Sequence, residues 1–367
     1  RRNTSWPVVR GDLFDTPTPR LLEISEMAPR EPDLVIGGPP CQPFSKSGYW
    51  HRGDAKRLDD PRATTLHAFM RVVADALPAA FLLENVPGLA YNGKDEGLQL
   101  LGALTERINR EHGTRYRLSV RQLKATDFGV PQVRERVYEV AAPVPSPFKF
   151  PEPTHGEQDL FLKPVTTAWD AIGDLTEPES DDLRVTGKWA GLLPSIPEGR
   201  NYLHHTSRGG GLPLFGWRRR FWSFLLKLAK NKPSWTIQAQ PGPATGPFHW
   251  KNRKLSMREL GRLQTFPDDI EIAGSHREVQ RQIGNAVPSL LAEILAREIR
   301  TQILGDPAFE SEPTLLPRRQ SPPPPPEPVW PVAPPYLSLV GEHSAHPGTG
   351  AGYAAVHRRQ SPEPMPQ

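Results

Sequence analysis

The alternation of apolar runs with amphipathic stretches between residues 33 and 142 is the feature that most constrains the fold of this chain. Short runs at 33–36, 79–83, 116–120 and 137–142 are typical of strands. Between them, apolar residues recur every three or four positions over 64–77 and 98–108, which predicts two helices. A further strand is predicted at residues 8–9. Strands that alternate with helices indicate an α/β fold with a doubly wound, Rossmann-like sheet.

The pattern weakens after residue 143, where a smaller and less regular domain is predicted over 146–256. Between 208 and 262, twelve lysines and arginines face a single acid, Glu259, and four tryptophans lie among them. Basic and aromatic side chains together suit a phosphate backbone and its bases, although a solvated basic surface has the same composition. Two more helices are predicted at 258–264 and 289–304.

The predicted organisation is therefore an α/β domain of residues 1–145 and 257–304, interrupted by the irregular domain and followed by a tail. The tail, 305–367, holds 16 of the 44 prolines, so we expect it to be disordered. The single cysteine among 367 residues cannot form an internal disulfide, which suits a cytoplasmic protein. No run is long enough to span a membrane, and we expect neither a membrane partner nor a metal site.

Polar side chains lie at the ends of three of the predicted strands. They are Cys41 in Gly-Gly-Pro-Pro-Cys, Glu84 in Glu-Asn-Val, and the pair Arg134 and Arg136. Open α/β sheets place their ligands at the carboxyl edge of the strands, so a nucleophile, a carboxyl group and two cations there form a candidate active site. Each residue alone has an ordinary explanation, because a lone cysteine is usually a packing residue and arginines are usually surface charges.

Five ordered motifs resemble those of the DNA cytosine-5 methyltransferases of bacterial restriction–modification systems. They lie at 38–45, 84–86, 132–136, 258–267 and 282–288. The basic, Trp-rich stretch falls where that family keeps its target-recognition domain.

The resemblance implies transfer of a methyl group from S-adenosylmethionine to carbon 5 of a cytosine in duplex DNA. Cys41 would attack carbon 6, because carbon 5 becomes nucleophilic only in the resulting adduct. Glu84 would donate a proton to ring N3, and Arg134 and Arg136 would hold the O2 edge. The target base must leave the helical stack, which makes this a base-flipping reaction.

Further residues are assigned by the same resemblance. The predicted cofactor contacts are Asp12, Leu13, Pro39, Thr65, Asn285 and Ala286. The predicted DNA contacts are Gln42, Ser45, Arg218, Arg219, Arg220, Lys251 and Arg253. The family's Phe-x-Gly-x-Gly loop is absent from the sequence. We therefore interpret the chain as N-terminally truncated, without the family's first strand and this loop.

Two other functions are compatible with the same residues. One is an RNA cytosine-5 methyltransferase, and the other is an inactive DNA-binding remnant that lacks the cofactor loop. For the main hypothesis we expect a monomer that acts on double-stranded DNA and shares its site with a cognate restriction endonuclease.

Overall fold

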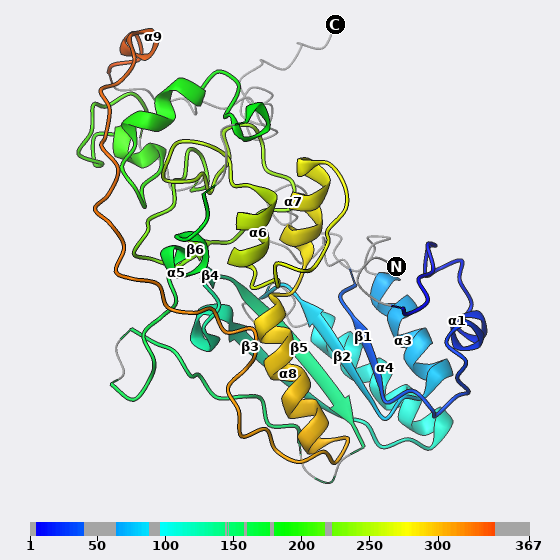
Figure 1. Ribbon diagram of the computed structural model, residues 1–367. Coiled ribbons are helices and arrows are strands. Elements are labelled where there is room, and N and C mark those ends of the chain that lie inside the picture. The colour runs from blue at the N-terminus through cyan, green and yellow to red at the C-terminus, as the bar shows by residue number, and fades with distance from the viewer. Residues whose placement is uncertain are drawn as a thin grey trace, which may run out of the picture. The chain divides into compact units, whose positions relative to one another are not determined.

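The computed structural model describes residues 5–39, 64–87, 96–143, 145, 147–157, 160–176, 180–216 and 222–341. The chain forms two compact units (Figure 1). The first takes in residues 1–165, 264–272 and 287–317, and the second takes in residues 166–263, 273–286 and 318–367. The second unit therefore includes more of the chain than the predicted 146–256.

A four-stranded sheet organises the first unit. Its order is β1 (Leu34–Gly37), β2 (Ala80–Asn85), β5 (Glu135–Ala142) and β3 (Arg117–Lys124). β1 and β2 are parallel, whereas β5 runs antiparallel to both of its neighbours. Only the ten residues 125–134 connect β3 to β5, and a parallel connection needs a dozen or more. The predicted α/β fold class is confirmed, and the sheet is mixed, since it contains both parallel and antiparallel pairs.

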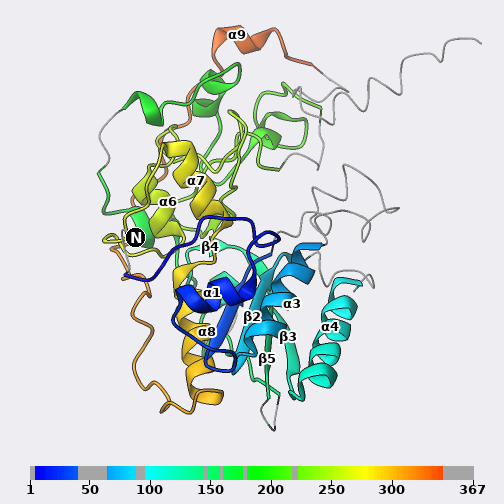
Figure 2. The ribbon, with the colours of Figure 1, turned by 90° about the vertical axis from the view of Figure 1, so that its right-hand side faces the viewer.

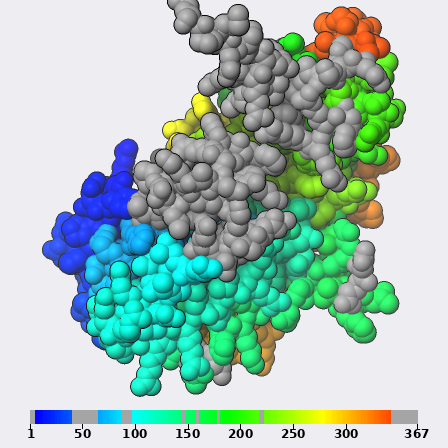
Figure 3. Space-filling model, turned by 180° about the vertical axis from the view of Figure 1, so that it is seen from behind, coloured from blue at the N-terminus to red at the C-terminus, as the bar shows by residue number. Residues whose placement is uncertain are grey.

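Helices cover both faces of this sheet, as Figure 2 shows. α3 (Thr64–Ala76) and α4 (Glu96–His112) pack on one face, where their apolar residues meet Phe81, Leu83 and Ala141. The outward surfaces of these two helices are visible in Figure 3. α8 (Ser289–Gln302) packs on the opposite face against Leu82 and Val140. Burial of apolar residues on both faces is what the doubly wound pattern predicts.

The predicted strand at Val8 and Val9 is wrong, because both residues are exposed and form no strand. The segment crosses to α3 instead, where Arg71 donates to the carbonyls of Leu13 (2.6 Å) and Thr16 (3.0 Å). The short helix α1 (Thr18–Ile24) follows and packs on α3. Two β-branched residues are too few to outweigh these contacts.

Short elements complete the first unit between its long strands. They are η4 (Ala125–Phe128) and β4 (Gln132–Val133). Within the described residues, no helix has the length and apolar character needed to cross a membrane.

The second unit has little regular structure, as its composition predicts. Among the described residues between 166 and 286, its helices and strand are α5 (Ala168–Ile172), β6 (Ser234–Trp235), α6 (Met257–Leu263) and α7 (His276–Asn285), with 3-10 turns at Asp181–Leu183, Ala190–Ser195 and Tyr202–His205. Aromatic rings build its core: Trp189, Tyr202, Phe215 and Phe224 meet edge to face with centroids 5.3–6.0 Å apart. Such pairs add to the free energy gained by burial alone.

Residues 318–341, which we call the strap, belong to the second unit and include α9 (Pro334–Leu337) (Figure 1). The Trp330 amide donates to the Pro194 carbonyl (3.1 Å), and the Tyr336 ring stacks on Trp189. The strap therefore makes specific contacts, whereas the proline content predicts a disordered tail. The contacts come from main-chain groups and isolated aromatic residues, which the proline content does not reveal. Residues 342–367 lie outside the described part of the chain.

Candidate active site

Glu84 lies near the carboxyl end of β2, where the parallel strand β1 also ends. Gly37 pairs with Leu83 in the register of the two strands, so the chain leaves β1 beside Glu84. A Cβ atom on Gly38 would stand 3.2 Å from Glu84 Oε2, and one on Gly37 would overlap the Phe69 ring at 2.4 Å. Glycine at these two positions therefore allows α3 and Glu84 to approach the end of β1 closely.

Arg136 forms an ion pair with Glu84. The Arg136 Nε atom is 2.9 Å from Glu84 Oε1, and both side chains are 17% exposed. Arg136 also donates from Nη1 to the carbonyl of Glu135 (2.7 Å), which fixes the plane of the guanidinium group. Burial raises the pKa of Glu84, while the charges of Arg136 and Arg134 oppose that rise. The net shift is upward, so this carboxyl group keeps a proton at higher pH than an exposed glutamate.

Arg134 lies between β4 and β5 and is only 2% exposed. Its carbonyl accepts a hydrogen bond from the Ala125 amide (2.8 Å), which anchors this part of the chain. Burial, followed by the neighbouring charge of Arg136, lowers the pKa of Arg134 to about 10. Because Arg134 and Arg136 both act on the pKa of Glu84, the structure brings together three of the four predicted catalytic residues.

The sequence patterns did not identify two buried groups next to this cluster. Tyr138 stands opposite Glu84 in the β2–β5 register, and Glu139 stands opposite Leu83 on the other face of the sheet. Glu139 is fully buried, and neither of its carboxyl oxygens has a hydrogen-bond partner among the described residues. Burial, with a smaller effect of the Glu84 charge, raises the pKa of Glu139 to about 8. An acid inside the apolar run 137–142 is the signal that could have identified it.

Several predicted residues lie outside the described part of the chain. These are Cys41, Gln42, Ser45, Arg218, Arg219 and Arg220.

The six predicted cofactor contacts are divided between the two units. Asp12 is exposed in a turn where its Oδ1 atom accepts from the Phe14 amide (3.0 Å), and Leu13 is held on α3 by Arg71. Pro39 follows β1, and Thr65 lies in the first turn of α3. Asn285 ends α7 and Ala286 follows it, both in the second unit. Their joint role stays a prediction.

The residues of the first unit fit one part of S-adenosylmethionine. The exposed carboxylate of Asp12 is an acceptor suited to the adenine amino group. Ile36 on β1 is exposed, and an apolar side chain suits a ring face. A glycine-rich loop that could cradle the methionine portion is absent from the sequence.

In the second unit, the structure describes two of the predicted DNA contacts, and they differ in their exposure and in their partners. Lys251 is exposed, whereas Arg253 holds the buried Glu259 with two hydrogen bonds of 2.7 Å. Glu259 also accepts from the Ser256 amide (2.8 Å) and caps the start of α6. Arg253 is thus engaged within the protein.

His249 completes this network. Its Nδ1 atom accepts from the Lys251 amide (3.1 Å), so the proton lies on Nε2, which faces Glu259 Oε1 at 3.4 Å. Burial, followed by the charges of Arg253, Lys251 and Lys230, lowers the pKa of His249 to about 2. The imidazole is therefore neutral.

The ion pair of Glu84 and Arg136 lies at the edge of the sheet where β1 and β2 end, which is where open α/β sheets bind their ligands. The family model described as C-5 cytosine-specific DNA methylase matches residues 15–301, and the chain belongs to this family.

Two individual relatives support this family membership. The chain is 41% identical over 312 residues to the type II methyltransferase M.SacI of Streptomyces achromogenes, covering 80% of this chain and 78% of that protein. It is 34% identical over 314 residues to the type II methyltransferase M.NgoFVII of Neisseria gonorrhoeae, covering 82% and 76%.

Among solved structures, the Entamoeba histolytica methyltransferase EhMeth has a similar fold, with a TM-score of 0.50 and 16% identity over 80% of this chain and 83% of that one. A methyltransferase encoded within an E. coli prophage gives a TM-score of 0.50 and 21% identity over 81% and 86%.

Proposed function

We propose that this protein transfers a methyl group from S-adenosylmethionine to carbon 5 of a flipped cytosine in double-stranded DNA, with Cys41 as the nucleophile. The observation that carries the proposal is the ion pair between Arg136 and Glu84 beside the end of β1. In the sequence, Cys41 follows Gly38 by three residues.

The properties of Glu84 suit the proton that this reaction needs. Addition of a thiolate to carbon 6 places negative charge on the ring, and a protonated carboxyl group at N3 disperses it. Burial raises the pKa of Glu84, so a larger fraction of its carboxyl groups carries that proton near neutral pH. Arg136 orients the carboxyl group at 2.9 Å, and its fixed guanidinium plane can also donate toward the O2 edge of the base.

The cofactor supplies an electrophilic methyl group to carbon 5. We assign Asp12 and Leu13 to the adenosine part and Pro39, Thr65, Asn285 and Ala286 to the remainder of the site. After methyl transfer, loss of the carbon-5 proton and departure of the Cys41 thiolate restore the aromatic ring.

For the second unit, we propose target recognition, with Lys251 and the segment around 218–220 as DNA contacts. Arg253 is better assigned to stabilising that unit through Glu259. We also propose that the protein acts as a monomer and that a restriction endonuclease shares its site.

Hydrogen exchange at carbon 5 tests the base half of the site without the methyl donor. Thiolate addition to carbon 6, protonation of carbon 5 and reversal exchange that hydrogen with water. A duplex with tritium at carbon 5 of its cytosines should therefore release tritium to solvent, and Cys41→Ser should abolish the release. Glu84→Gln should slow it by roughly a hundredfold, since general acid catalysis contributes about 10²–10⁴ in rate.

Glu106→Gln is the matched control, because Glu106 is an exposed acid on α4. Release that persists in Cys41→Ser would contradict the assignment of the nucleophile. Transfer of a labelled methyl group to the same duplex and to a folded RNA then separates DNA from RNA methylation. Tritium release without methyl transfer would identify a protein that keeps the base chemistry and lacks a working cofactor site.

A further inference from the structure

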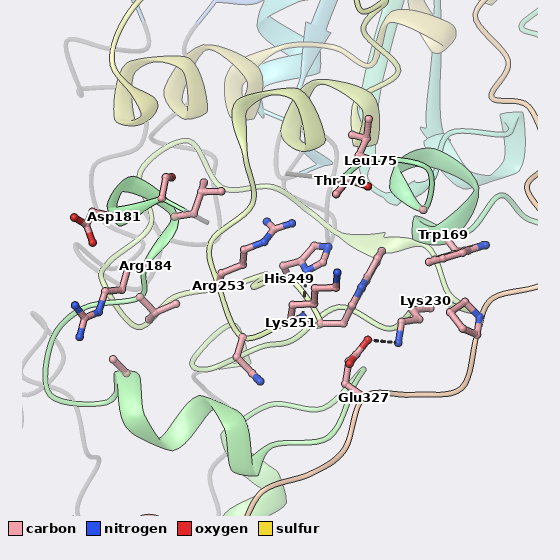
Figure 4. Close-up of a pocket in the computed structure, with 18 of the residues that line it drawn as sticks. Trp169, Leu175, Thr176, Asp181, Arg184, Lys230, His249, Lys251, Arg253 and Glu327 are labelled. Carbon is pink, nitrogen blue, oxygen red and sulfur yellow. Dashed lines mark hydrogen bonds and ion pairs between the residues drawn. The ribbon is translucent and has the colours of Figure 1, made fainter. Parts of the chain in front are cut away.

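The second unit contains a cavity of about 1160 Å³ whose walls are basic and aromatic (Figure 4). Four cationic side chains line it: Arg184, Lys230, Lys251 and Arg253. The indole rings of Trp169 and Trp250 lie beside Lys230, whose ammonium group is 5.8 Å from the Trp250 ring centroid. Two acids, Asp181 and Glu327, also line the cavity, and Glu327 comes from the strap.

Lys230 is the most enclosed of these cations, with a side chain that is 3% exposed. Its ammonium group donates to Glu198 Oε1 (2.8 Å), to Glu327 Oε1 (2.9 Å) and to the Pro325 carbonyl (3.0 Å). An ammonium group has three N–H donors, so these acceptors satisfy it completely. Two of the three belong to the strap.

The two carboxylates on Lys230 differ in their access to solvent. Glu198 is 6% exposed, whereas Glu327 is 37% exposed and meets Lys230 from the strap (Figure 4). Leaving a buried charge without its partner is strongly destabilising, whereas an exposed partner can be replaced by water or by another anion. Glu198 is therefore the permanent counter-ion, and Glu327 is the exchangeable one.

The strap does not need the Glu327 side chain to stay in place. The Glu327 amide donates to Glu198 Oε1 (2.8 Å), and the Trp169 indole donates to the Ser321 carbonyl (2.8 Å). The Gln320 amide donates to Asp170 Oδ1 (3.2 Å). Neutralising the Glu327 carboxylate therefore removes a charge from the cavity and leaves these anchors intact.

The remaining charges of the cavity favour an anion. Within the described part of the chain, the side chains of Arg184 and Lys251 have no ion-pair partner, and both are exposed. Arg253 is held by Glu259, and Asp181 is the one acid on the walls besides Glu327. Burial lowers the pKa of the nearby Lys227 to about 8, which Glu198 and Glu327 partly oppose, so this lysine still adds positive charge at pH 7.

We propose that this cavity binds a phosphate group of the nucleic-acid backbone, and that the Glu327 carboxylate occupies the phosphate position at Lys230. The strap is then an internal competitor that weakens DNA binding. A carboxylate and a phosphate oxygen accept the same charge-assisted hydrogen bond from an ammonium group, so one replaces the other without rearranging Lys230. The identity of the ligand as DNA rests on the proposed function, whereas the anion site itself does not.

Glu327→Gln tests the proposal in the full chain, with Glu310→Gln as the matched control. Glu310 is an exposed acid that lies before the strap, in the first unit, so its substitution changes the net charge equally. Binding of a fluorescent duplex is measured by anisotropy from 50 to 200 mM salt. Glu327→Gln should bind several-fold tighter than the parent, and the slope of log K against log salt should steepen by about 0.9, the value for one additional phosphate contact. Glu310→Gln should leave the slope unchanged.

Inorganic phosphate provides a readout that does not depend on DNA. Millimolar phosphate should raise the melting temperature of Glu327→Gln more than that of the parent or of Glu310→Gln. Equal shifts in all three proteins would overturn the anion site. A larger shift with phosphate but an unchanged DNA salt slope would overturn the assignment to the nucleic-acid backbone. Failure of methyl transfer in the parent would concern the proposed function alone, because neither binding measurement requires catalysis.

Discussion

Replacing the buried acid Glu139 with a neutral residue should stabilise the protein, and the gain should grow with pH. Glu139 stands between Leu83 and Val120 in the sheet registers, on the face that packs against α3 and α4. Both carboxyl oxygens lack a hydrogen-bond partner among the described residues, and burial raises the pKa to about 8. The folded protein therefore holds a proton that the unfolded chain, with a pKa near 4.5, releases.

The sign and size of the effect follow from proton linkage. Above pH 4.5 the folded state binds more protons at this position than the unfolded state, so its contribution to stability falls as pH rises toward about 8. One pKa unit corresponds to about 1.36 kcal/mol, which makes the loss about 2.5 kcal/mol greater at pH 7 than at pH 5. Glu139→Gln and Glu139→Met remove the titrating group and should not show this loss.

Urea unfolding of the parent and both variants at pH 5, 6, 7 and 8 measures the effect. Titrations elsewhere in the chain are common to all three proteins and cancel in the difference. Both variants should show the same dependence of stability on pH, because both lack the titrating carboxyl group. Only the glutamine variant also buries an amide without hydrogen-bond partners, so the difference between the two variants measures the cost of that amide. Glu106→Gln should change stability by less than about 0.5 kcal/mol at every pH. A parent-to-variant difference that stays constant from pH 5 to pH 8 would refute the protonated state of Glu139.

Three other substitutions probe the site and the second unit. Arg136→Gln should slow tritium release by roughly a hundredfold and move the alkaline limb of its pH profile upward, because the arginine charge opposes the raised pKa of Glu84; a limb that does not move contradicts the coupling. Glu259→Gln should destabilise the protein by about 3 kcal/mol in urea unfolding, since it leaves Arg253 without its buried partner, and a neutral effect would count against that role. Tyr336→Ala should make the strap more sensitive to limited proteolysis, because the ring stacks on Trp189 and its hydroxyl donates to the Lys188 carbonyl (2.8 Å).

Periodicity predicted the helices that cover the sheet, since α3 and α8 present continuous apolar faces to the core. It did not predict α7, which buries few apolar residues, mainly Val279 and Ile283. A local signal for α7 does exist, because Ser275 and Glu278 form a capping box at its start. The antiparallel direction of β5 could have been inferred from the short connection between β3 and β5.

The residues of the candidate site could likewise be predicted only in part. Motif resemblance found Glu84, Arg134 and Arg136, whose ion pair and mutual effects on pKa the structure then describes. Contacts between distant segments gave no sequence signal: the prolines of the strap indicate an extended chain, but nothing in them identifies Lys230 as the residue they meet.

Glu84 and Glu139 lie in different surroundings, and we expect only those of Glu84 to suit proton transfer. They lie on opposite faces of the same sheet, and burial raises the pKa of each. Burial raises the pKa of Glu84, and the charges of Arg136, at 2.9 Å, and of Arg134 oppose that rise. Glu139 has no such partner among the described residues, and it stays protonated near neutral pH. A catalytic acid must lose and regain its proton in every cycle, so we propose Glu84, which has a counter-ion, as that acid, and we expect Arg136 to influence the pH range of the reaction.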